Sequence, residues 1–352
     1  MYIHENNINK KLYKIIFGMM KNQLWYTLLK TIGYSGKTLM MTPKNVILIT
    51  GCDSGLGHSL ALYCYSLNMT VISACHNVKS EGARLLRNDN DSQRMFTIEV
   101  DLLKEDTITC AFQYIKDFLL TNTEYQFTAL VNNAGVMCFG EFEWQTSEQF
   151  EMQINVNVLG AMRLTKKLLP LIRQHRARII NITSHCGLQA LPALSSYAAS
   201  KAALRFWCDS LRIEMQQYGV DVINFVPGSF VQFSNISARQ QEHAKVMFDA
   251  FNDEQRQLYS AYFRQFNNYL KVVSGFKSPN QFHDTILLDK FKAALTDSIP
   301  QAMYIHEPWR YKIYRFLFRV CPTPIVDLLT VRFCALPTYQ NVQKPSLENK
   351  KS

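Results

Sequence analysis

The chain has 352 residues, of which 47% are hydrophobic, so it can bury the core of one large α/β domain or of two modest ones. Its nine scattered cysteines lack CxxC spacing, which argues against a disulfide framework or a zinc site and favours a reducing compartment. The formal net charge is +10, but residues 1–44 alone carry seven lysines and one acidic residue. Because the middle of the chain has no basic run with interleaved aromatics, we expect no nucleic-acid partner. From the cysteine spacing we expect no bound metal.

Residues 1–43 form a basic and apolar N-terminal segment. Its apolar runs, Ile15–Met20 and Leu24–Leu29, are each ended by a lysine, so neither reaches the roughly eighteen residues that a spanning helix needs. No clear signal-peptide cleavage site follows them. The pattern predicts association with a membrane surface. A mitochondrial transit peptide is the alternative, and the absence of arginine from the segment weakens it.

The chain then alternates predicted strands and helices. The helical patterns include Glu148–Gln174 and Tyr197–Gln217. The expected strands are short and apolar without strict alternation, as when helices cover both faces of a parallel sheet. They are Val46–Thr50, Thr70–Cys75, Met95–Val100, Phe127–Asn132, Arg178–Ser184, Val220–Val226 and Ala302–Ile305. This pattern predicts an α/β fold with a doubly wound parallel sheet, whose ligand lies beyond the carboxyl ends of the strands.

A glycine-rich turn follows the first strand, with the spacing Thr50-Gly51-x-x-x-Gly55-x-Gly57. Glycines allow a tight turn and let a pyrophosphate approach a helix N-terminus, where free N–H groups and the helix dipole favour an anion. A glycine turn before a helix can also be purely structural. This stretch alone therefore leaves both interpretations open.

A second motif, Tyr197-Ala-Ala-Ser-Lys201, places a phenol and an ammonium on one face of a predicted helix. A tyrosine has a pKa of about 10, and a neighbouring lysine cation lowers it by favouring the phenolate. Such a group suits acid–base chemistry between a carbonyl and an alcohol. Ser184 ends the preceding strand and Asn157 lies on an earlier helix. Taken alone, a tyrosine and a lysine at this spacing are most often a surface pair without a catalytic role. The presence of Ser184 and the glycine turn in the same sequence favours a catalytic role.

These motifs together make the sequence similar to the short-chain dehydrogenase/reductase family over roughly residues 44–305. The motifs are the glycine turn, Asp101-Leu102, Asn132-Asn133-Ala134-Gly135, Asn157, Ser184, Tyr197-x-x-x-Lys201 and Pro227-Gly228. The stretches GCDSG and LVNNAGV, the latter followed by FGEFEW, resemble the branch with retinol, 17β-hydroxysteroid and hydroxybutyrate dehydrogenases. The segment CHNVKSEGARLLR and the aromatic region after Pro227 most resemble arthropod Shroud-type enzymes of ecdysteroid (moulting-hormone) biosynthesis. The resemblance implies a single Rossmann-type domain over residues 44–306.

The resemblance also implies a catalytic set. Tyr197 would give or take the hydroxyl proton, and Lys201 would lower its pKa and hold the nicotinamide ribose. Ser184 would polarise the substrate oxygen. Asn157 would hold a water that links Lys201 to solvent.

By the same resemblance, a larger set would bind the cofactor. Asp101 would contact the adenine edge, and Asn133 and Gly135 would shape the cleft or act only structurally. The full set is Thr50, Gly51, Asp53, Ser54, Gly55, Leu56, Gly57, Cys75, Asp101, Leu102, Asn133, Ala134, Gly135, Tyr197, Lys201, Pro227 and Gly228.

Two positions depart from the family pattern. Cys75 stands where an acidic residue often holds the adenine ribose. Gln232 stands where a threonine or serine is common, so either Ser229 or Gln232 would serve the nicotinamide amide, or binding there would be looser. No arginine occupies the glycine turn or follows Cys75 directly, and Asp53 would repel a 2′-phosphate. We therefore favour NAD(H), with NADP(H) left open.

We expect a helical substrate lid over residues 229–300. Its aromatic residues favour a bulky lipophilic alcohol or ketone, such as a steroid, a sterol or a retinoid. They are Phe230, Phe233, Phe248, Phe251, Tyr259, Tyr262, Phe263, Phe266, Tyr269 and Phe276. The alternatives are that they only pack the lid, that the substrate is a small hydroxy acid held by Arg264, or that the protein is a cofactor-bound scaffold without turnover.

Residues 307–352 form an amphipathic extension and a polar tail. Apolar side chains share one helical face here, with basic ones away from it: Ile313, Phe316, Leu317 and Val320 against Lys312, Arg315 and Arg319. The pattern fits an interfacial helix or a flap docked on the body. We expect a membrane surface and a lipophilic small molecule as partners, with homo-oligomerisation open. The expected location is the cytosolic side of the endoplasmic reticulum membrane, with the cytoplasm and mitochondria as alternatives.

Overall fold

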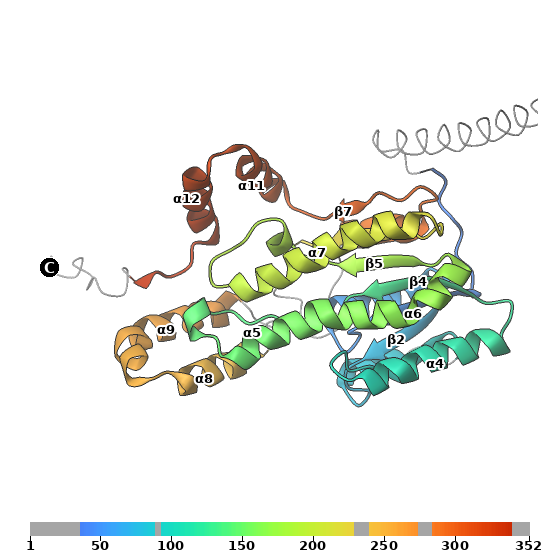
Figure 1. Cartoon of the computed structure of the whole chain (residues 1–352), viewed down its shortest axis with the longest axis horizontal. Coiled ribbons are helices and arrows are strands. Elements are labelled where there is room, and N and C mark those ends of the chain that lie inside the picture. Colours follow the sequence, from blue (N-terminus) through green and yellow to red (C-terminus); the bar gives the residue numbers. More distant parts are fainter. Residues whose placement is uncertain (1–35, 89–92, 229–238, 274–283, 340–352) are drawn as a thin grey trace, which may run out of the picture.

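The computed structural model describes residues 36–88, 93–228, 239–273 and 284–339. Its centre is a seven-stranded parallel sheet in the order β3-β2-β1-β4-β5-β6-β7 (Figure 1). The strands are β1 (Asn45–Thr50), β2 (Thr70–Cys75), β3 (Met95–Glu99), β4 (Gln126–Asn132), β5 (Arg178–Ile182), β6 (Val222–Val226) and β7 (Met303–Ile305). All seven lie where the sequence predicts them, and the strand order reverses beside β1 as in a doubly wound sheet.

Helices cover both faces of the sheet. One face carries α2 (Gly55–Ser66), α3 (Glu81–Asn88) and α10 (Thr285–Thr296), and the other carries α4 (Glu105–Thr121), α6 (Ala161–His175) and α7 (Ser195–Gln216). Strand β1 explains the lack of alternation in the sequence: Ile47 and Ile49 enter the first core, while Val46 and Leu48 enter the second. All four side chains are fully buried. Each such side chain stabilises the fold by about 1.5–3 kcal/mol.

The predicted long helix after Glu148 is interrupted. Helix α5 (Ser147–Ile154) starts at a Thr146 capping box, and a π-helical turn (Asn155–Gly160) joins it to α6. A π-turn widens the helix and changes which residues face inward. The turn contains Asn157, which is buried.

The lid contains helices α8 (Gln240–Ala250) and α9 (Asp253–Val273). The lid packs around Trp144, which precedes it in the sequence. The Trp144 ring lies 5.1–5.9 Å from four aromatic rings of α9: Tyr259, Tyr262, Phe263 and Phe266. Helix α10 packs instead on the sheet through the buried Leu287 and Phe291. The expectation that the lid extends to residue 300 is therefore wrong for α10. The predicted Phe230, Phe233 and Phe276 lie outside the described residues.

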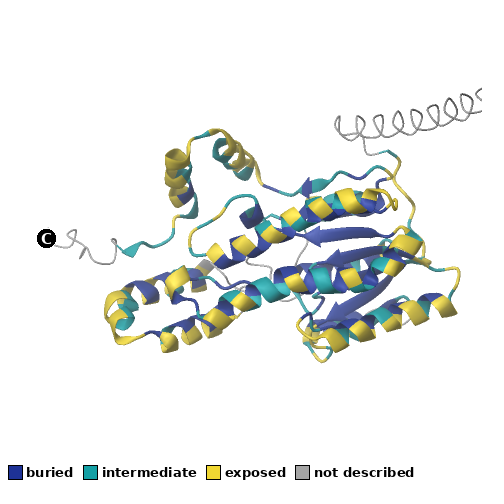
Figure 2. Ribbon diagram, in the orientation of Figure 1, coloured by how far each residue is buried: buried dark blue, intermediate teal, exposed yellow. Residues whose placement is uncertain are grey.

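The C-terminal extension contains two helices, α11 (Trp309–Val320) and α12 (Thr323–Cys334), of which only the first is predicted. Figure 1 shows them set off from the rest of the molecule. Figure 2 shows that their surface is largely exposed. Among the helices of the described ranges, none is both long and apolar enough to cross a bilayer.

Candidate active site

A cavity of about 960 Å³ opens beyond the carboxyl ends of the strands. Three of the four predicted catalytic residues, Ser184, Tyr197 and Lys201, line it. Most of the predicted cofactor residues line it as well: Gly51, Asp53, Ser54, Leu56, Gly57, Asp101, Leu102, Asn133, Ala134, Gly135, Pro227 and Gly228. The strands thus bring motifs that are far apart in the sequence to one site.

The glycine turn is shaped by close backbone approaches. Gly51 has φ +70°, and a Cβ there would lie 2.9 Å from the Cα of Ala134. A Cβ on Gly57 would lie 2.2 Å from the carbonyl oxygen of Gly51. Helix α2 begins directly after Ser54, whose hydroxyl does not cap the helix, so its first N–H groups remain for a ligand. These features fit the pyrophosphate of a dinucleotide at a helix N-terminus.

Thr50 and Asn133 fasten this turn to strand β4. The Thr50 hydroxyl accepts the N–H groups of Asn133 and Ala134, both at 3.0 Å, and Asn133 Nδ2 donates to the Thr50 carbonyl at 2.8 Å. Thr50 does not line the cavity, and neither does Gly55. Both residues shape the turn, and their direct contact with the cofactor stays a prediction. Gly135 does line the cavity, and a Cβ there would lie 3.4 Å from Lys201 Nζ.

Tyr197 and Lys201 lie on α7 and are both buried. Burial raises the pKa of Tyr197 above its ordinary value; the Cys186 thiol adds to this, and the hydrogen bond with Ser184 opposes it. Burial also lowers the pKa of Lys201 to about 8. Lys201 Nζ donates to the Ile182 carbonyl at 3.0 Å and lies 5.8 Å from the centre of the Tyr197 ring. Burial is thus the largest effect on the Tyr197 pKa in this structure, and the lowering of that pKa by Lys201 stays a prediction.

Asn157 does not line the cavity, and its side chain is held by the protein itself. Its Oδ1 accepts the Val136 N–H at 2.7 Å, and its Nδ2 donates to the Val136 carbonyl at 2.9 Å and to Ser200 Oγ at 2.9 Å. Ser200 donates in turn to the Tyr197 carbonyl at 2.7 Å. Sequence reasoning missed Ser200, although a serine directly before Lys201 on the buried face was a signal. The role of Asn157 in holding a water stays a prediction.

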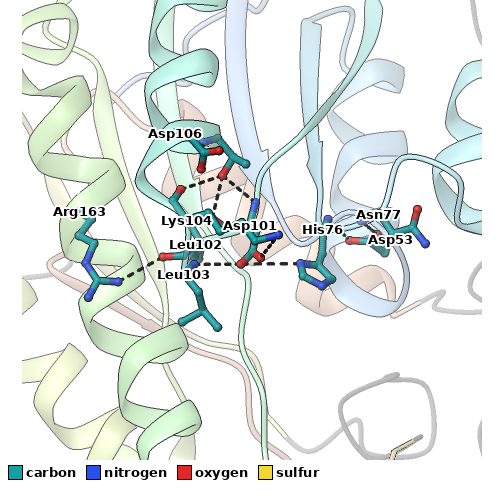
Figure 3. Close-up of polar contacts among 10 residues, drawn as sticks. Asp53, His76, Asn77, Asp101, Leu102, Leu103, Lys104, Asp106 and Arg163 are labelled. Carbon is teal, nitrogen blue, oxygen red and sulfur yellow. Dashed lines mark hydrogen bonds and ion pairs between the residues drawn. The ribbon is translucent and has the colours of Figure 1, made fainter.

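The end of the cavity where the adenine is expected lies after β2 and β3, and Figure 3 shows the polar contacts there. Asp53 accepts the backbone N–H groups of His76 and Asn77 at 2.8 and 2.9 Å. Asp101 accepts the N–H of Leu103 at 3.0 Å. The predicted cofactor residue Cys75 is fully buried and does not line the cavity, because every side chain of β2 enters the core. His76 lines the cavity in its place, and sequence reasoning did not single it out.

The remaining walls of the cavity are mainly apolar and aromatic. They include Met137, Phe139, Met152, Leu191, Leu194, Tyr269, Leu270, Tyr311, Phe333 and Leu336. Of the predicted lid aromatics within the described residues, only Tyr269 lines the cavity; most of the others pack around Trp144. Arg264 does not line it, whereas Arg239 and Arg310 do. Ser229 and Gln232 lie outside the described residues.

The cysteine thiols show neither disulfide bonds nor a metal site among the described residues. All nine cysteines are free thiols. Burial raises the pKa of Cys75 and Cys138 to about 12, so neither is a thiolate near neutral pH. Over the described ranges, no three His, Cys, Asp or Glu side chains lie together as a metal site.

Comparisons with known proteins agree with this geometry. The family model of short chain dehydrogenases matches residues 45–243. Retinol dehydrogenase 16 of Mus musculus is 32% identical over 80% of this chain and 86% of its own length, and mouse retinol dehydrogenase 7 is 31% identical over the same shares. Mouse mitochondrial D-beta-hydroxybutyrate dehydrogenase is 32% identical over 73% and 75%. A crystal structure of a metagenomic short-chain oxidoreductase in complex with NADP has the same fold, with a TM-score of 0.53, 20% identity and coverage of 76% and 98%. The chain therefore belongs to the short-chain dehydrogenase/reductase family of oxidoreductases.

Proposed function

We propose that this oxidoreductase interconverts a hydroxyl and a keto group on a bulky lipophilic substrate, either a steroid or sterol such as an ecdysteroid precursor, or a retinoid. One observation carries the proposal. Tyr197 and Ser184 lie in the same cavity as the wall of apolar and aromatic side chains, which includes Met137, Phe139 and Leu270. Pockets lined in this way bind apolar ligands and use a few polar groups to orient them.

The bound nicotinamide would supply or accept the hydride. Ser184 would donate a hydrogen bond to the substrate oxygen, and Tyr197 Oη would give or take its proton. Below its pKa of about 8, Lys201 is a cation and favours the phenolate over the phenol when the proton leaves Tyr197. Ser200 and Asn157 would act as positioning residues, because they hold the backbone at Tyr197.

The NAD(H) preference is also a proposal, and Asp53 supports it. Its carboxylate is held at the end of β2 by two backbone N–H groups, beside His76 and Asp101, which line the cavity. A negative charge at this place disfavours a 2′-phosphate. No lysine or arginine from β2, β3 or the turns after them lines the cavity in the part of the chain that the structure describes.

A small hydroxy acid is the second candidate substrate. Arg239 and Arg310 line the cavity and could hold a carboxylate, and the hydroxybutyrate dehydrogenases among the relatives are named for such a substrate. The extent of the apolar wall favours the lipophilic substrate over this candidate.

We further propose that the protein acts at the cytosolic side of the endoplasmic reticulum membrane. Nine free thiols suit a reducing compartment, and a sterol or retinoid partitions into lipid. Mitochondria are the alternative, since one relative is named as a mitochondrial enzyme. A homo-oligomer stays a prediction that sedimentation of the purified protein would test.

The direct test is turnover by the purified full chain, with NADH or NADPH and the oxidised forms, on sterols, retinoids and short hydroxy acids. We expect the highest kcat/KM with a sterol or retinoid and with NAD(H). Preference for a short hydroxy acid would support the second candidate. Tight cofactor binding without turnover of any substrate would favour a scaffold.

A further inference from the structure

The hairpin of α11 and α12, residues 309–334, exposes an apolar outer face. Helix α11 has no buried residue, and the side chains of Trp309, Phe316 and Leu328 are 70%, 64% and 68% exposed. Four more large apolar side chains of the hairpin are exposed to about half or more: Ile313, Val320, Ile325 and Val331. Several large apolar side chains exposed on one short hairpin indicate an interaction site.

The inner face of the same hairpin is a wall of the active-site cavity. Tyr311, Phe333 and Cys334 line the cavity together with Tyr197. The Tyr311 ring lies 5.2 Å from that of His185, the residue after Ser184, and 4.9 Å from that of Phe333. The hairpin thus has exposed apolar side chains on its outer face and side chains of the cavity wall on its inner face.

The hairpin is fastened so that its outer face points away from the body. Arg315 forms a bidentate ion pair with Glu307, with the shortest contact 2.7 Å, and the Glu307 side chain is only 2% exposed. After α12, the Pro337 carbonyl accepts the Tyr262 hydroxyl of the lid at 3.2 Å. The predicted apolar stripe on α11 is largely exposed in the part of the chain that the structure describes, which favours the interfacial helix over the docked flap.

Charge decides which partner suits this face. Residues 309–334 carry five basic side chains and one acidic one, Asp327. Within the described ranges no acidic side chain pairs with Arg310, Lys312, Arg319 or Arg332. A second copy of the same face would bring like charges together. An anionic lipid surface instead takes up tryptophan and phenylalanine at the interface and attracts the basic side chains around them.

We propose that the outer face of the α11–α12 hairpin docks on an anionic lipid surface, and that a lipophilic substrate passes from the lipid along this wall to Tyr197. The docking stands on the exposure and charge of the hairpin. The entry route rests on the proposed function. The two parts are tested by separate measurements.

Hydrogen exchange of the full chain with lipid vesicles tests the docking locally, whatever residues 1–35 do. We expect vesicles of phosphatidylcholine and phosphatidylserine to slow exchange in residues 309–334, and not in the solvent-facing helix α4. The variant Trp309→Ser/Phe316→Ser/Leu328→Ser should lose this protection. The matched control Phe206→Ser/Ile213→Ser, on α7 side chains that are 65% and 66% exposed, should keep it.

Charge is tested by Lys312→Gln and Arg319→Gln, each of which should weaken binding of the hairpin to the anionic vesicles about fivefold. The docking is overturned if vesicles leave residues 309–334 unprotected, or if their protection depends on protein concentration without lipid, as a second copy would require.

Turnover tests the entry route. The triple variant should keep its kcat/KM on a water-soluble alcohol and lose rate on a substrate dissolved in anionic vesicles. Equal rates of wild type and variant on the vesicle substrate, or equal losses on both substrates, would overturn the route. Absence of turnover by wild type on every alcohol would instead refute the proposed function and leave the exchange result standing.

Discussion

Ser200 links two parts of the active site: it accepts a hydrogen bond from Asn157 Nδ2 at 2.9 Å and donates one to the Tyr197 carbonyl at 2.7 Å. The π-turn and the first turn of α7 are thereby joined through one buried hydroxyl. Replacing Ser200 by alanine removes both hydrogen bonds; Asn157 Nδ2 keeps its bond to the Val136 carbonyl, but its second N–H loses its acceptor, which costs about 1–3 kcal/mol. We expect kcat to fall roughly tenfold through misplacement of Tyr197, with little change in the affinity for the dinucleotide.

Ser196 provides the matched control on the same helix. It is also buried, but its hydroxyl has no hydrogen-bond partner among the described residues. Ser196→Ala should therefore leave kcat unchanged. If Ser200→Ala and Ser196→Ala reduce kcat equally, or if Ser200→Ala leaves it intact, the positioning role is refuted. Ser200→Thr, which keeps the hydroxyl, should recover part of the rate.

Lys201 makes a second prediction, about stability. Its pKa falls to about 8 in the folded protein, against about 10.4 in an unfolded chain, so the unfolded state binds more protons between these values. Stability from this group therefore rises with pH across that window, and at pH 7 the buried cation is a cost. Lys201→Met removes the cost but leaves the Ile182 carbonyl unpaired, so we expect a net gain on the order of 1 kcal/mol at pH 7.

Urea unfolding of wild type and Lys201→Met at pH 7 and pH 9.5 checks this. The difference in unfolding free energy should shrink at the higher pH, while turnover is lost in the variant at both. The variant could instead be less stable than wild type at pH 7, by a margin that is unchanged at pH 9.5. That result would show that burial of the Lys201 charge does not destabilise the fold.

Asp53 predicts the choice of dinucleotide. Replacement by arginine would remove the acceptors of two backbone N–H groups as well as the charge, whereas Asp53→Asn removes the charge and keeps one acceptor oxygen, so it is the milder probe. Removal of the negative charge should raise the NADPH to NADH ratio of kcat/KM roughly tenfold. Asp117→Asn, an exposed carboxylate on α4, is the control and should not change the ratio. A wild-type enzyme that prefers NADPH would contradict the premise.

Trp144 predicts the stability of the lid. The ring is 1% exposed, and its indole N–H has no hydrogen-bond partner within the described ranges, so it acts through packing against α9. Trp144→Ala should reduce the unfolding free energy by about 3–5 kcal/mol. Phe142→Ala, two residues earlier and 63% exposed, should cost far less. If urea unfolding shows similar losses of unfolding free energy for Trp144→Ala and Phe142→Ala, Trp144 does not hold the lid in place.

Much of the fold and of the catalytic set is predictable from the sequence, because short apolar strands and local motifs such as Tyr197-x-x-x-Lys201 are written in consecutive residues. Contacts between distant segments are not. Whether Cys75 faces the cavity depends on which face of β2 is covered, and both faces prove to be covered. The aromatic side chains of the lid give the same sequence pattern whether they line a pocket or pack around Trp144. Periodicity therefore cannot distinguish a pocket wall from a packed core. The hydrogen bonds of Asp53 join the turn after β1 to the turn after β2, so they can be recognised only once both turns are folded.

The central claim is that Tyr197 carries the proton in a hydroxyl–keto interconversion, and Tyr197→Phe tests it most directly. The change removes only the hydroxyl, so the cavity and the cofactor residues should be preserved. Single-turnover hydride transfer should be measured on the best substrate, beside dinucleotide affinity from fluorescence titration. We predict that the transfer rate falls by roughly 10²–10⁴ while the affinity stays within a few-fold of wild type. A near-normal transfer rate in Tyr197→Phe would contradict the account.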